Sequence, residues 1–544
     1  MPTLDWIGKK AVVGHHNEVP FRLLRSNDGL SVGGGGSSSS GNLLVQGDNL
    51  TALKALLPYY AQQVKCIYID PPYNTGNENW VYNDNVNSPE IRGWLNQVVG
   101  GEAEDLSRHD KWLCMMYPRL CLLKEFLRED GAIFISIDDN EFHNLRQIMD
   151  EVFGPRNFVA TVLWQKVYSP KNSAKHFSED HDYIVVYARN AEMWRPNLLS
   201  RTLKQDKAYK NPDDDPRGLW KTSDLSARNP YSLGTYPVTC PSGRVIQGPP
   251  TGRYWTISEE KFLELDSDNR IWWGKSGNSI PQLKRFLSEV KQGVVPQTLW
   301  LYSEVGHTQE AKQELVATMD FEDSQSVFIT PKPVRLIRRI LEIGADRDSI
   351  ILDSFAGSGT TGIAALAANK EDGGNRRFIL VEIEEGICQS VTAERLRRVV
   401  NGYTAKKTGG KREETPGLGG GFRYCELGAP LFNADGQINR DVTFEDLARH
   451  VFFAETGEPL SQEASDRSPL VGVANGAAIY LLYNGILGDK SADGGNVLTP
   501  DLLSQLPRHN GPKVVYGEAC LIGDERLKRQ AVIFRQIPYE VKVN

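Results

Sequence analysis

Apolar runs of strand length alternate with helical patterns in two separate blocks of the chain, about 41–160 and 325–402. In the first block a helical pattern stops at Pro58, and a second one closes at Gly131 just before the strand-like run AIFISI. Strands that alternate with helices form a parallel sheet covered by helices. The two blocks therefore predict one discontinuous α/β domain.

The rest of the chain lacks this alternation of strand and helix patterns. Tryptophans, prolines and short polar turns interrupt one another over 161–324, which predicts an inserted, mixed or mostly β region. Residues 1–40 form an N-terminal arm that ends in the Gly/Ser linker VGGGGSSSSG. A polar, glycine-rich linker is predicted at 403–420, and 421–544 is predicted to be a small C-terminal α/β domain.

Composition narrows the class of protein. The chain of 544 residues is 40% hydrophobic and 24% charged, which is typical of a soluble protein with more than one structural unit. No apolar run resembles a signal peptide or a membrane span, so we expect a cytoplasmic location and no membrane partner. The seven cysteines form no CxxC pair. His176 and His181 have no further ligand nearby, so no metal site is predicted.

The net charge of −7 does not exclude binding to nucleic acid, because local clusters of Lys and Arg decide that property. One such cluster is RLRRVVNGYTAKKTGGKR, at 395–412. It is interpreted equally well as a solvated helix end and as a phosphate contact.

A glycine loop predicts cofactor binding. Gly357, Gly359 and Gly362 follow a strand over 350–353 and open a helix, and Glu382 closes the next strand. In this setting GxGxxG lets a ligand approach the backbone closely, and the acid can accept hydrogen bonds from ribose hydroxyls. The loop alone leaves a dinucleotide and S-adenosylmethionine as alternatives, since both contain adenosine.

The tetrapeptide DPPY predicts the chemistry. Asp70 stands where the strand CIYI ends, and Pro71 and Pro72 hold the following carbonyls rigidly. A carboxylate and the Pro71 carbonyl are two acceptors that suit the hydrogens of an exocyclic amino group, such as N6 of adenine. Tyr73 offers an aromatic face to a base that has left the stack.

These motifs resemble those of the amino DNA methyltransferases. DPPY precedes DSFAGSGTTG in the chain, which resembles the permuted order of the β group. NLLVQGDNLTALKALLPYY, HDYIVVYARN and GDERLKRQAVIFRQIPYEVKV are similar to the modification subunits of type III restriction-modification systems. The resemblance implies a doubly wound, Rossmann-like sheet, S-adenosylmethionine as cofactor, and transfer of a methyl group to adenine N6 in double-stranded DNA.

The resemblance also implies roles for single residues. Asp70, Pro71, Pro72 and Tyr73 are the expected catalytic residues. Asp48 is expected either to approach the adenine end of the cofactor or only to cap the next helix. The expected cofactor-binding residues are Asp48, Lys332, Pro333, Asp353, Phe355, Gly357, Gly359, Thr360 and Glu382.

The insert is expected to read the DNA sequence, since the catalytic sheet offers a pocket for one base only. The candidates for DNA contact are Lys166, Lys171, Lys175, Arg217, Arg244 and Arg253. The resemblance further implies a homodimer and a helicase-nuclease partner. Three alternative functions stay open: a cytosine-N4 methyltransferase, a nicotinamide-dependent oxidoreductase, and a non-enzymatic DNA-recognition subunit that serves a nuclease.

Overall fold

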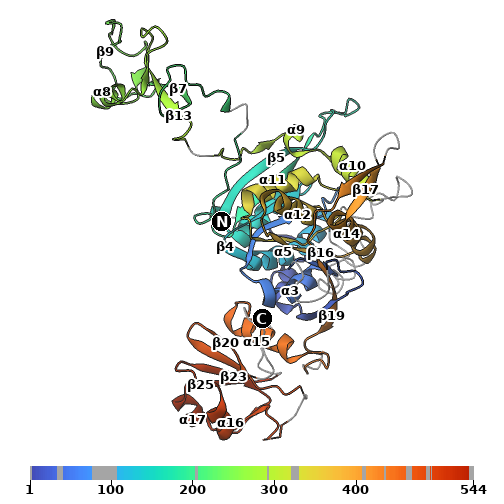
Figure 1. Ribbon diagram of the computed structural model, residues 1–544. Helices are drawn as coiled ribbons and strands as arrows, with labels where there is room; N and C mark the ends of the chain where they lie inside the picture. The colour runs from blue at the N-terminus through green and yellow to red at the C-terminus, as the bar shows by residue number, and fades with distance from the viewer. Residues whose placement is uncertain are drawn as a thin grey trace. The chain divides into compact units, whose positions relative to one another are not determined.

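The chain divides into two compact units, one of Met1–Asn197 with Gln297–Asn544 and one of Leu198–Pro296 (Figure 1). The computed structural model describes residues 3–33, 41–75, 107–201, 206–290, 293–319, 330–406, 412–433, 437–460, 468–485, 490–491 and 493–537.

A ten-stranded, mostly parallel sheet organises the first unit. From β19 through β2, β16, β15 and β3 to β4, neighbouring strands are parallel, while β1 and β6 run antiparallel to their neighbours. In sheet order the strands are β1 (Arg22–Ser26), β19 (Arg423–Pro430), β2 (Leu43–Gln46), β16 (Arg377–Glu382), β15 (Ile350–Asp353), β3 (Val64–Ile69), β4 (Leu127–Ile137), β6 (His181–Ala188), β5 (Phe158–Gln165) and β14 (Leu299–Trp300).

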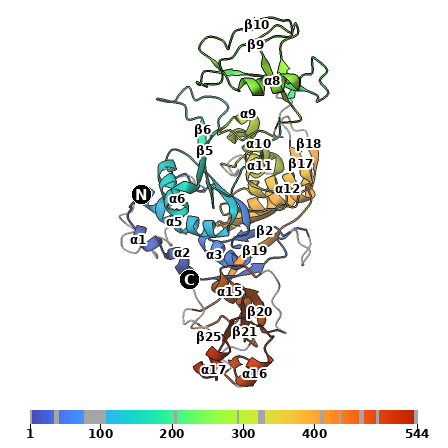
Figure 2. The ribbon, with the colours of Figure 1, turned by 90° about the vertical axis from the view of Figure 1, so that its left-hand side faces the viewer.

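Helices cover both faces of this sheet, because its strands are apolar on both sides. Every residue of β3 is buried. Ile67 of β3 packs into the core that contains Leu53 and Leu120, whereas the neighbouring Cys66 faces Gly344 on the opposite side. The first layer consists of α3 (Asn49–Tyr60), α5 (Arg108–Phe126) and α6 (Phe142–Phe153), and the second of α11 (Val334–Gly344), α12 (Thr360–Asp372) and α14 (Glu394–Asn401) (Figure 2).

The order of the strands creates a crevice between β3 and β15. After β3 the chain continues to β4 on one side, and after β15 it continues to β16 on the other side. Ligands of open α/β sheets bind at such a switch point, outside the carboxyl ends of the strands. Asp70 directly follows β3, and Asp353 is the last residue of β15.

Two helix ends differ from the sequence prediction. Pro58 lies inside α3, which ends two residues later at Tyr60. Gly131 lies inside β4, since α5 already ends at Phe126 and the strand begins at Leu127. The buried side chains around Pro58 favour continued packing of α3, whereas α5 ends earlier than predicted and β4 already includes Gly131.

The compact second unit, Leu198–Pro296, contains fewer residues than the predicted insert, 161–324. Strands β5 and β6 and the short β14 belong to the large sheet, because their apolar residues extend it beyond β4. Helices α9 (Tyr302–Val305) and α10 (Thr308–Thr318) also belong to the first unit. Pairing between strands so far apart in the chain leaves no local sequence signal.

The predicted arm and linker also form regular structure. Short helices α1 (Lys9–Val12) and α2 (His15–Glu18) precede β1, which pairs with β19. Within 403–420, β17 (Gly402–Lys406) and β18 (Arg412–Pro416) form an antiparallel pair. The linker prediction was wrong there because threonines and a tyrosine among the polar residues favour strands.

The second unit is a small, mostly β body (Figure 1). Its core contains Leu225, Tyr236, Trp255, Phe262 and Trp273. Its main sheet has the order β12-β13-β7, and two further strand pairs join β10 to β9 and β11 to β8. The elements are β7 (Trp220–Asp224), β8 (Ser226–Ala227), β9 (Val238–Thr239), β10 (Val245–Ile246), β11 (Tyr254–Trp255), α8 (Glu259–Ser267), β12 (Ile271–Trp272) and β13 (Gln282–Phe286).

The C-terminal segment has a sheet of its own, in the order β20-β21-β23-β25, although β19 joins the large sheet. Its elements are α15 (Phe444–Thr456), β20 (Leu470–Ala474), β21 (Ala477–Leu481), β22 (Val497–Leu498), α16 (Pro500–Gln505), β23 (Lys513–Gly517), β24 (Ala519–Cys520), α17 (Asp524–Arg529) and β25 (Val532–Gln536). Among all described residues, none of the helices combines the length and the apolar character needed to span a bilayer.

The N-terminal segment should be part of the folded core. Phe21 is only 6% exposed and packs against His450 and Phe453 of α15. We expect Phe21→Ala to lower the free energy of unfolding by about 3 kcal/mol, because it leaves a cavity. Urea denaturation followed by tryptophan fluorescence measures the change. Val13→Ala, at a site 40% exposed, is the control and should stay within about 0.5 kcal/mol of the parent. Equal effects would contradict a packed role for the segment.

Candidate active site

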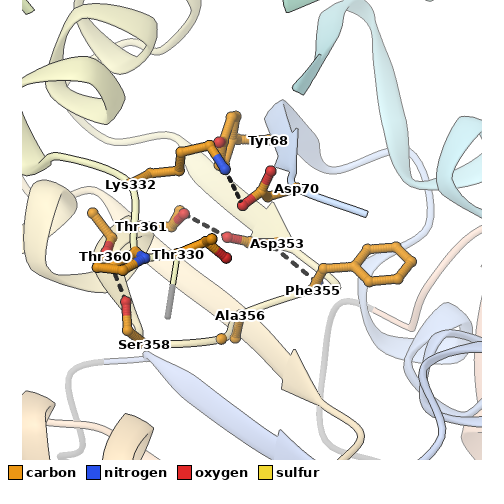
Figure 3. Close-up of a pocket in the computed structure, with 12 residues that line it drawn as sticks. Tyr68, Asp70, Thr330, Lys332, Asp353, Phe355, Ala356, Ser358, Thr360 and Thr361 are labelled. Carbon is orange, nitrogen blue, oxygen red and sulfur yellow. Dashed lines mark hydrogen bonds and ion pairs between the residues drawn. The ribbon is translucent and has the colours of Figure 1, made fainter. Parts of the chain in front are cut away.

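Asp70 and Lys332 form a buried ion pair at the carboxyl end of β3. The Lys332 ammonium donates to Asp70 Oδ2 at 2.5 Å, and the Lys332 and Asp70 side chains are 8% and 10% exposed (Figure 3). Burial raises the pKa of Asp70, and the Lys332 charge opposes that rise. Asp70 Oδ1 is buried and accepts no hydrogen bond from any described residue. A polar group buried in this way is costly unless a ligand completes it.

The turn that carries Asp70 is held by helix α5. Trp112 Nε1 donates to the Pro72 carbonyl at 2.7 Å. Asn74, with φ of 58°, donates to the Arg108 carbonyl and to the fully buried Glu141. Asp70 Oδ1 is therefore an open acceptor of the tetrapeptide among the described residues.

Tyr73 is fixed by a second buried acid. Its hydroxyl donates to Asp182 Oδ2 at 3.4 Å, and Lys166 donates to Asp182 Oδ1 at 2.6 Å. The Lys332 ammonium lies 5.0 Å from the centre of the Tyr73 ring. Lys166, predicted to contact DNA, therefore forms an ion pair inside the site. Asp138 lies near this pair, and burial raises its pKa to about 6.

The glycine loop joins β15 to α12, and it contains positions that only glycine occupies without strain or steric clash. Gly359 has φ of 74°, in the left-handed region. A Cβ atom on Gly362 would lie 2.9 Å from Leu396, so the third glycine lets α12 pack closely. Glu382 Oε2 accepts from the Gly357 amide at 2.8 Å and Oε1 from the Glu384 amide at 3.0 Å. The acid at the end of β16 thus braces the loop.

Asp353 anchors the start of the same loop. Its oxygens accept from the Phe355 amide at 3.0 Å and from Thr361 Oγ1 at 2.5 Å (Figure 3). Burial raises the pKa of Asp353 to about 7, although both hydrogen bonds oppose the rise. This carboxyl group therefore carries a proton far more readily than an exposed one.

One small pocket lies between Asp70 and the glycine loop. Of the residues predicted from the sequence, Asp70, Lys332, Asp353, Phe355, Gly357 and Thr360 line it. Pro333 begins α11 as its N-cap, and Glu382 supports the loop from behind; both lie outside the lining. The lining also includes residues that the sequence analysis did not name as candidates: Tyr68, Thr330 and Pro331, and Ala356, Ser358 and Thr361 within DSFAGSGTTG.

Asp48 and Arg395 have structural partners. Asp48 caps α3, since its Oδ1 accepts from the Thr51 amide at 2.9 Å, and its Oδ2 pairs with the buried Arg119. Arg395 begins the basic cluster 395–412 but is 1% exposed, and it donates to Ser358 and Thr360 beneath the glycine loop. The interpretation of Arg395 as a phosphate contact is therefore wrong.

The remaining candidates for DNA contact differ in their surroundings. Lys171 and Lys175 are exposed. In the second unit, Arg217 forms a two-point contact with Asp215 and a further ion pair with Asp268. Arg244 donates to the Asn278 carbonyl at 3.3 Å, and Arg253 donates to the Ser226 carbonyl. Across the described ranges no cluster of three or more His, Cys, Asp or Glu side chains is suited to a metal ion.

The raised pKa of Asp353 predicts how stability depends on pH. The folded state holds a proton up to about pH 7, whereas the unfolded carboxyl loses it near its usual value of 3.8. The unfolding free energy should therefore fall as pH rises from about 5 to about 8, on the order of 2 kcal/mol from this group. Urea denaturation should show a shallower fall for Asp353→Asn. Parallel pH curves for the two proteins would refute the assignment.

Comparisons of the sequence identify relatives. A family model described as DNA methylase, of the N6 and N4 methyltransferases, matches residues 64–394, more than half of the chain. The type III restriction-modification enzyme StyLTI Mod subunit of Salmonella typhimurium is 37% identical over 66% of this chain and 55% of that protein. The EcoPI Mod subunit of Escherichia phage P1 is 33% identical over 72% and 65%. The type II methyltransferase M.KpnI of Klebsiella pneumoniae is 32% identical over 65% and 83%.

Solved structures resemble this chain with low TM-scores. The cytosine-N4-specific PvuII DNA methyltransferase has a TM-score of 0.33 at 12% identity, covering 66% of this chain and 87% of that one. A putative DNA modification methylase of Thermus thermophilus, in complex with S-adenosyl-L-methionine, has a TM-score of 0.30 at 13% identity, covering 66% of this chain and 96% of that one.

The chain spans between a little over half and just under two thirds of the length of the two Mod subunits. On the family match, the chain belongs to the N6/N4 DNA methylase family.

Proposed function

We propose that this chain is a DNA methyltransferase that transfers a methyl group from S-adenosylmethionine to N6 of an adenine in double-stranded DNA. The observation that carries the proposal is the buried Asp70 Oδ1, which has no partner in the described chain. It lies in the same cavity as the glycine loop. An acceptor of this kind, beside a site for an adenosine-containing cofactor, suits an amino group that must be held while it reacts.

The cavity has the donor and acceptor groups that the cofactor requires. Gly357 and Ser358 border it, and Phe355 adds an apolar ring. In the proposed complex Glu382, which also braces the loop, would accept from the ribose hydroxyls. Thr360 and Asp353 would contact the cofactor on the loop side, and Lys332 and Pro333 would lie beside its methionine part. Asp48, held by Arg119, approaches the adenine end. The bound cofactor supplies an electrophilic methyl group on a sulfonium centre.

The tetrapeptide prepares the amino group for attack. Asp70 Oδ1 and the Pro71 carbonyl would accept the two N6 hydrogens, which would free the nitrogen lone pair from conjugation with the ring. Tyr73, fixed by Asp182, stacks on the base after it leaves the duplex. The bound cofactor would supply the methyl carbon, and Asp70 would accept the surplus N6 proton and pass it to water. Positioning and electrostatics supply the rate.

The proposed function includes the finer fold and the assembly. The fold is the doubly wound, Rossmann-like methyltransferase sheet in its permuted order, with DPPY before the glycine loop. The relatives named as type III Mod subunits support a role as the modification subunit of a restriction-modification system. The partners proposed with that role are a helicase-nuclease subunit and a second copy of this chain.

Changing Asp70 should slow catalysis strongly. We expect Asp70→Asn to lower the rate of methyl transfer by about 10²- to 10³-fold, because the amide offers a weaker acceptor. Genomic DNA that lacks the modification is treated with the protein, and the methylated bases are identified by mass spectrometry. The control is Asp139→Asn, at the end of the next strand and exposed, which should keep the parent rate.

The same assay separates the alternatives. N4-methylcytosine in place of N6-methyladenine would make the chain a cytosine enzyme. Full modification by the Asp70→Asn variant, or no methylated base with the parent protein, would exclude the proposed function.

Lys332 should keep Asp70 ionised. Its charge opposes the rise in the pKa of Asp70 that burial causes. We therefore expect Lys332→Met to move the acid limb of the rate–pH profile to higher pH and to lower the maximal rate, whereas Lys332→Arg should keep the limb near that of the parent. Single-turnover rates from acidic to alkaline pH measure this. An unshifted limb, together with weaker cofactor binding by calorimetry, would assign Lys332 to the cofactor alone.

A further inference from the structure

Two like charges face each other across the central sheet of the second unit. Lys221 of β7 lies directly opposite Arg285 of β13 in an antiparallel pair, and both side chains are exposed. Like charges in this arrangement destabilise a sheet, whereas opposite charges stabilise it. Within the described residues neither side chain forms an ion pair with a carboxylate. The fold alone therefore gives no reason for this pair.

The surrounding residues add positive charge and an aromatic ring. Lys210 bridges to Trp220, so Tyr209 is next to Lys221 in the adjoining row. The Lys221 ammonium and the Arg201 guanidinium each lie 5.2 Å from the centre of the Tyr209 ring. Arg201 and Lys221 also line an open pocket. The only acid that pairs with this group in the described chain is Asp206, at 2.7 Å from Arg201.

Several other cations of the same unit are paired with acids. Arg217 and the buried Lys284 share Asp215, and Arg270 pairs with Asp268 and Glu289. Among the described residues, Lys221 and Arg285 have no such acidic partner.

We propose that Lys221 and Arg285, together with Arg201, form a binding surface for the phosphodiester backbone of duplex DNA, which we call the cationic row. The inference rests on the proposed function and adds the surface by which the second unit holds the substrate. Side chains opposite each other in a sheet lie about 5 Å apart at Cβ, so that phosphate oxygens can contact both cations. Such contacts fix the register of the protein on DNA without reading bases.

The test measures binding of the full-length protein to a fluorescein-labelled duplex by anisotropy, from about 50 to about 300 mM KCl. We expect Lys221→Gln and Arg285→Gln each to weaken binding about threefold to tenfold, equally for unrelated duplex sequences. Each should also make the slope of log K against log salt shallower by about 0.9, the value for one phosphate contact. Lys261→Gln is the matched control, because Lys261 is exposed in the same unit but is paired with Glu264. Its slope should equal that of the parent.

Thermal melting distinguishes this role from a structural one. Removing one of two repelling charges should leave the melting temperature unchanged or raise it, whereas a packing role predicts a fall. Unchanged salt slopes in both variants would overturn the inference, as would an equal loss in the Lys261→Gln control. Competition by polyglutamate as strong as that by DNA of equal charge concentration would also overturn it, since the occupant would then be an acidic polypeptide.

The two proposals fail separately. A parent protein that binds DNA with the full slope and forms no methylated base contradicts the proposed function and leaves the cationic row standing. A parent protein that methylates adenine, with variants whose slopes do not change, contradicts only the cationic row. A parent protein that does not bind duplex DNA excludes both.

Discussion

The burial of Asp70 beside Lys332 is the interaction on which the site depends. A carboxylate buried at the carboxyl ends of the strands loses its hydration. The Lys332 ammonium, at 2.5 Å, compensates part of that loss. The pairing uses Oδ2 alone, so Oδ1 remains without a partner in the described chain. A site built this way has a strong acceptor with a fixed direction, which is what a weakly nucleophilic amino group needs.

Parallel strands explain how residues so far apart in the chain meet. Asp70, Lys332 and Asp353 come from three segments, and the strand order β16-β15-β3-β4 brings their ends to one edge. Insertion of a whole second unit between β6 and β14 in the chain leaves this edge unchanged, because β15 and β16 complete the sheet after the insertion. The permuted order of the motifs is therefore compatible with one site.

The sequence predicted features that arise locally and missed those that depend on distant contacts. The strand ends at Asp70, Asp353 and Glu382 were predicted correctly, because apolar runs and turn residues mark them. The support of the Pro72 carbonyl by Trp112 has no such signal, since their spacing reflects tertiary packing. The extension of the sheet by β5 and β6 was missed for the same reason. The predicted roles of the site residues in binding and catalysis remain predictions.

Counting cations in a sequence cannot identify a DNA surface in a protein of net charge −7. Arg217 was a candidate by residue type, yet its guanidinium is bound by Asp215 and Asp268. Lys221 and Arg285 were not predicted to contact DNA, because nothing in the sequence shows that they are opposite each other. What separates the two cases is whether a carboxylate compensates the charge. An uncompensated cation raises the energy of the free protein, and a phosphate removes that cost on binding. Local imbalance of charge is therefore a better guide to such a surface than local abundance.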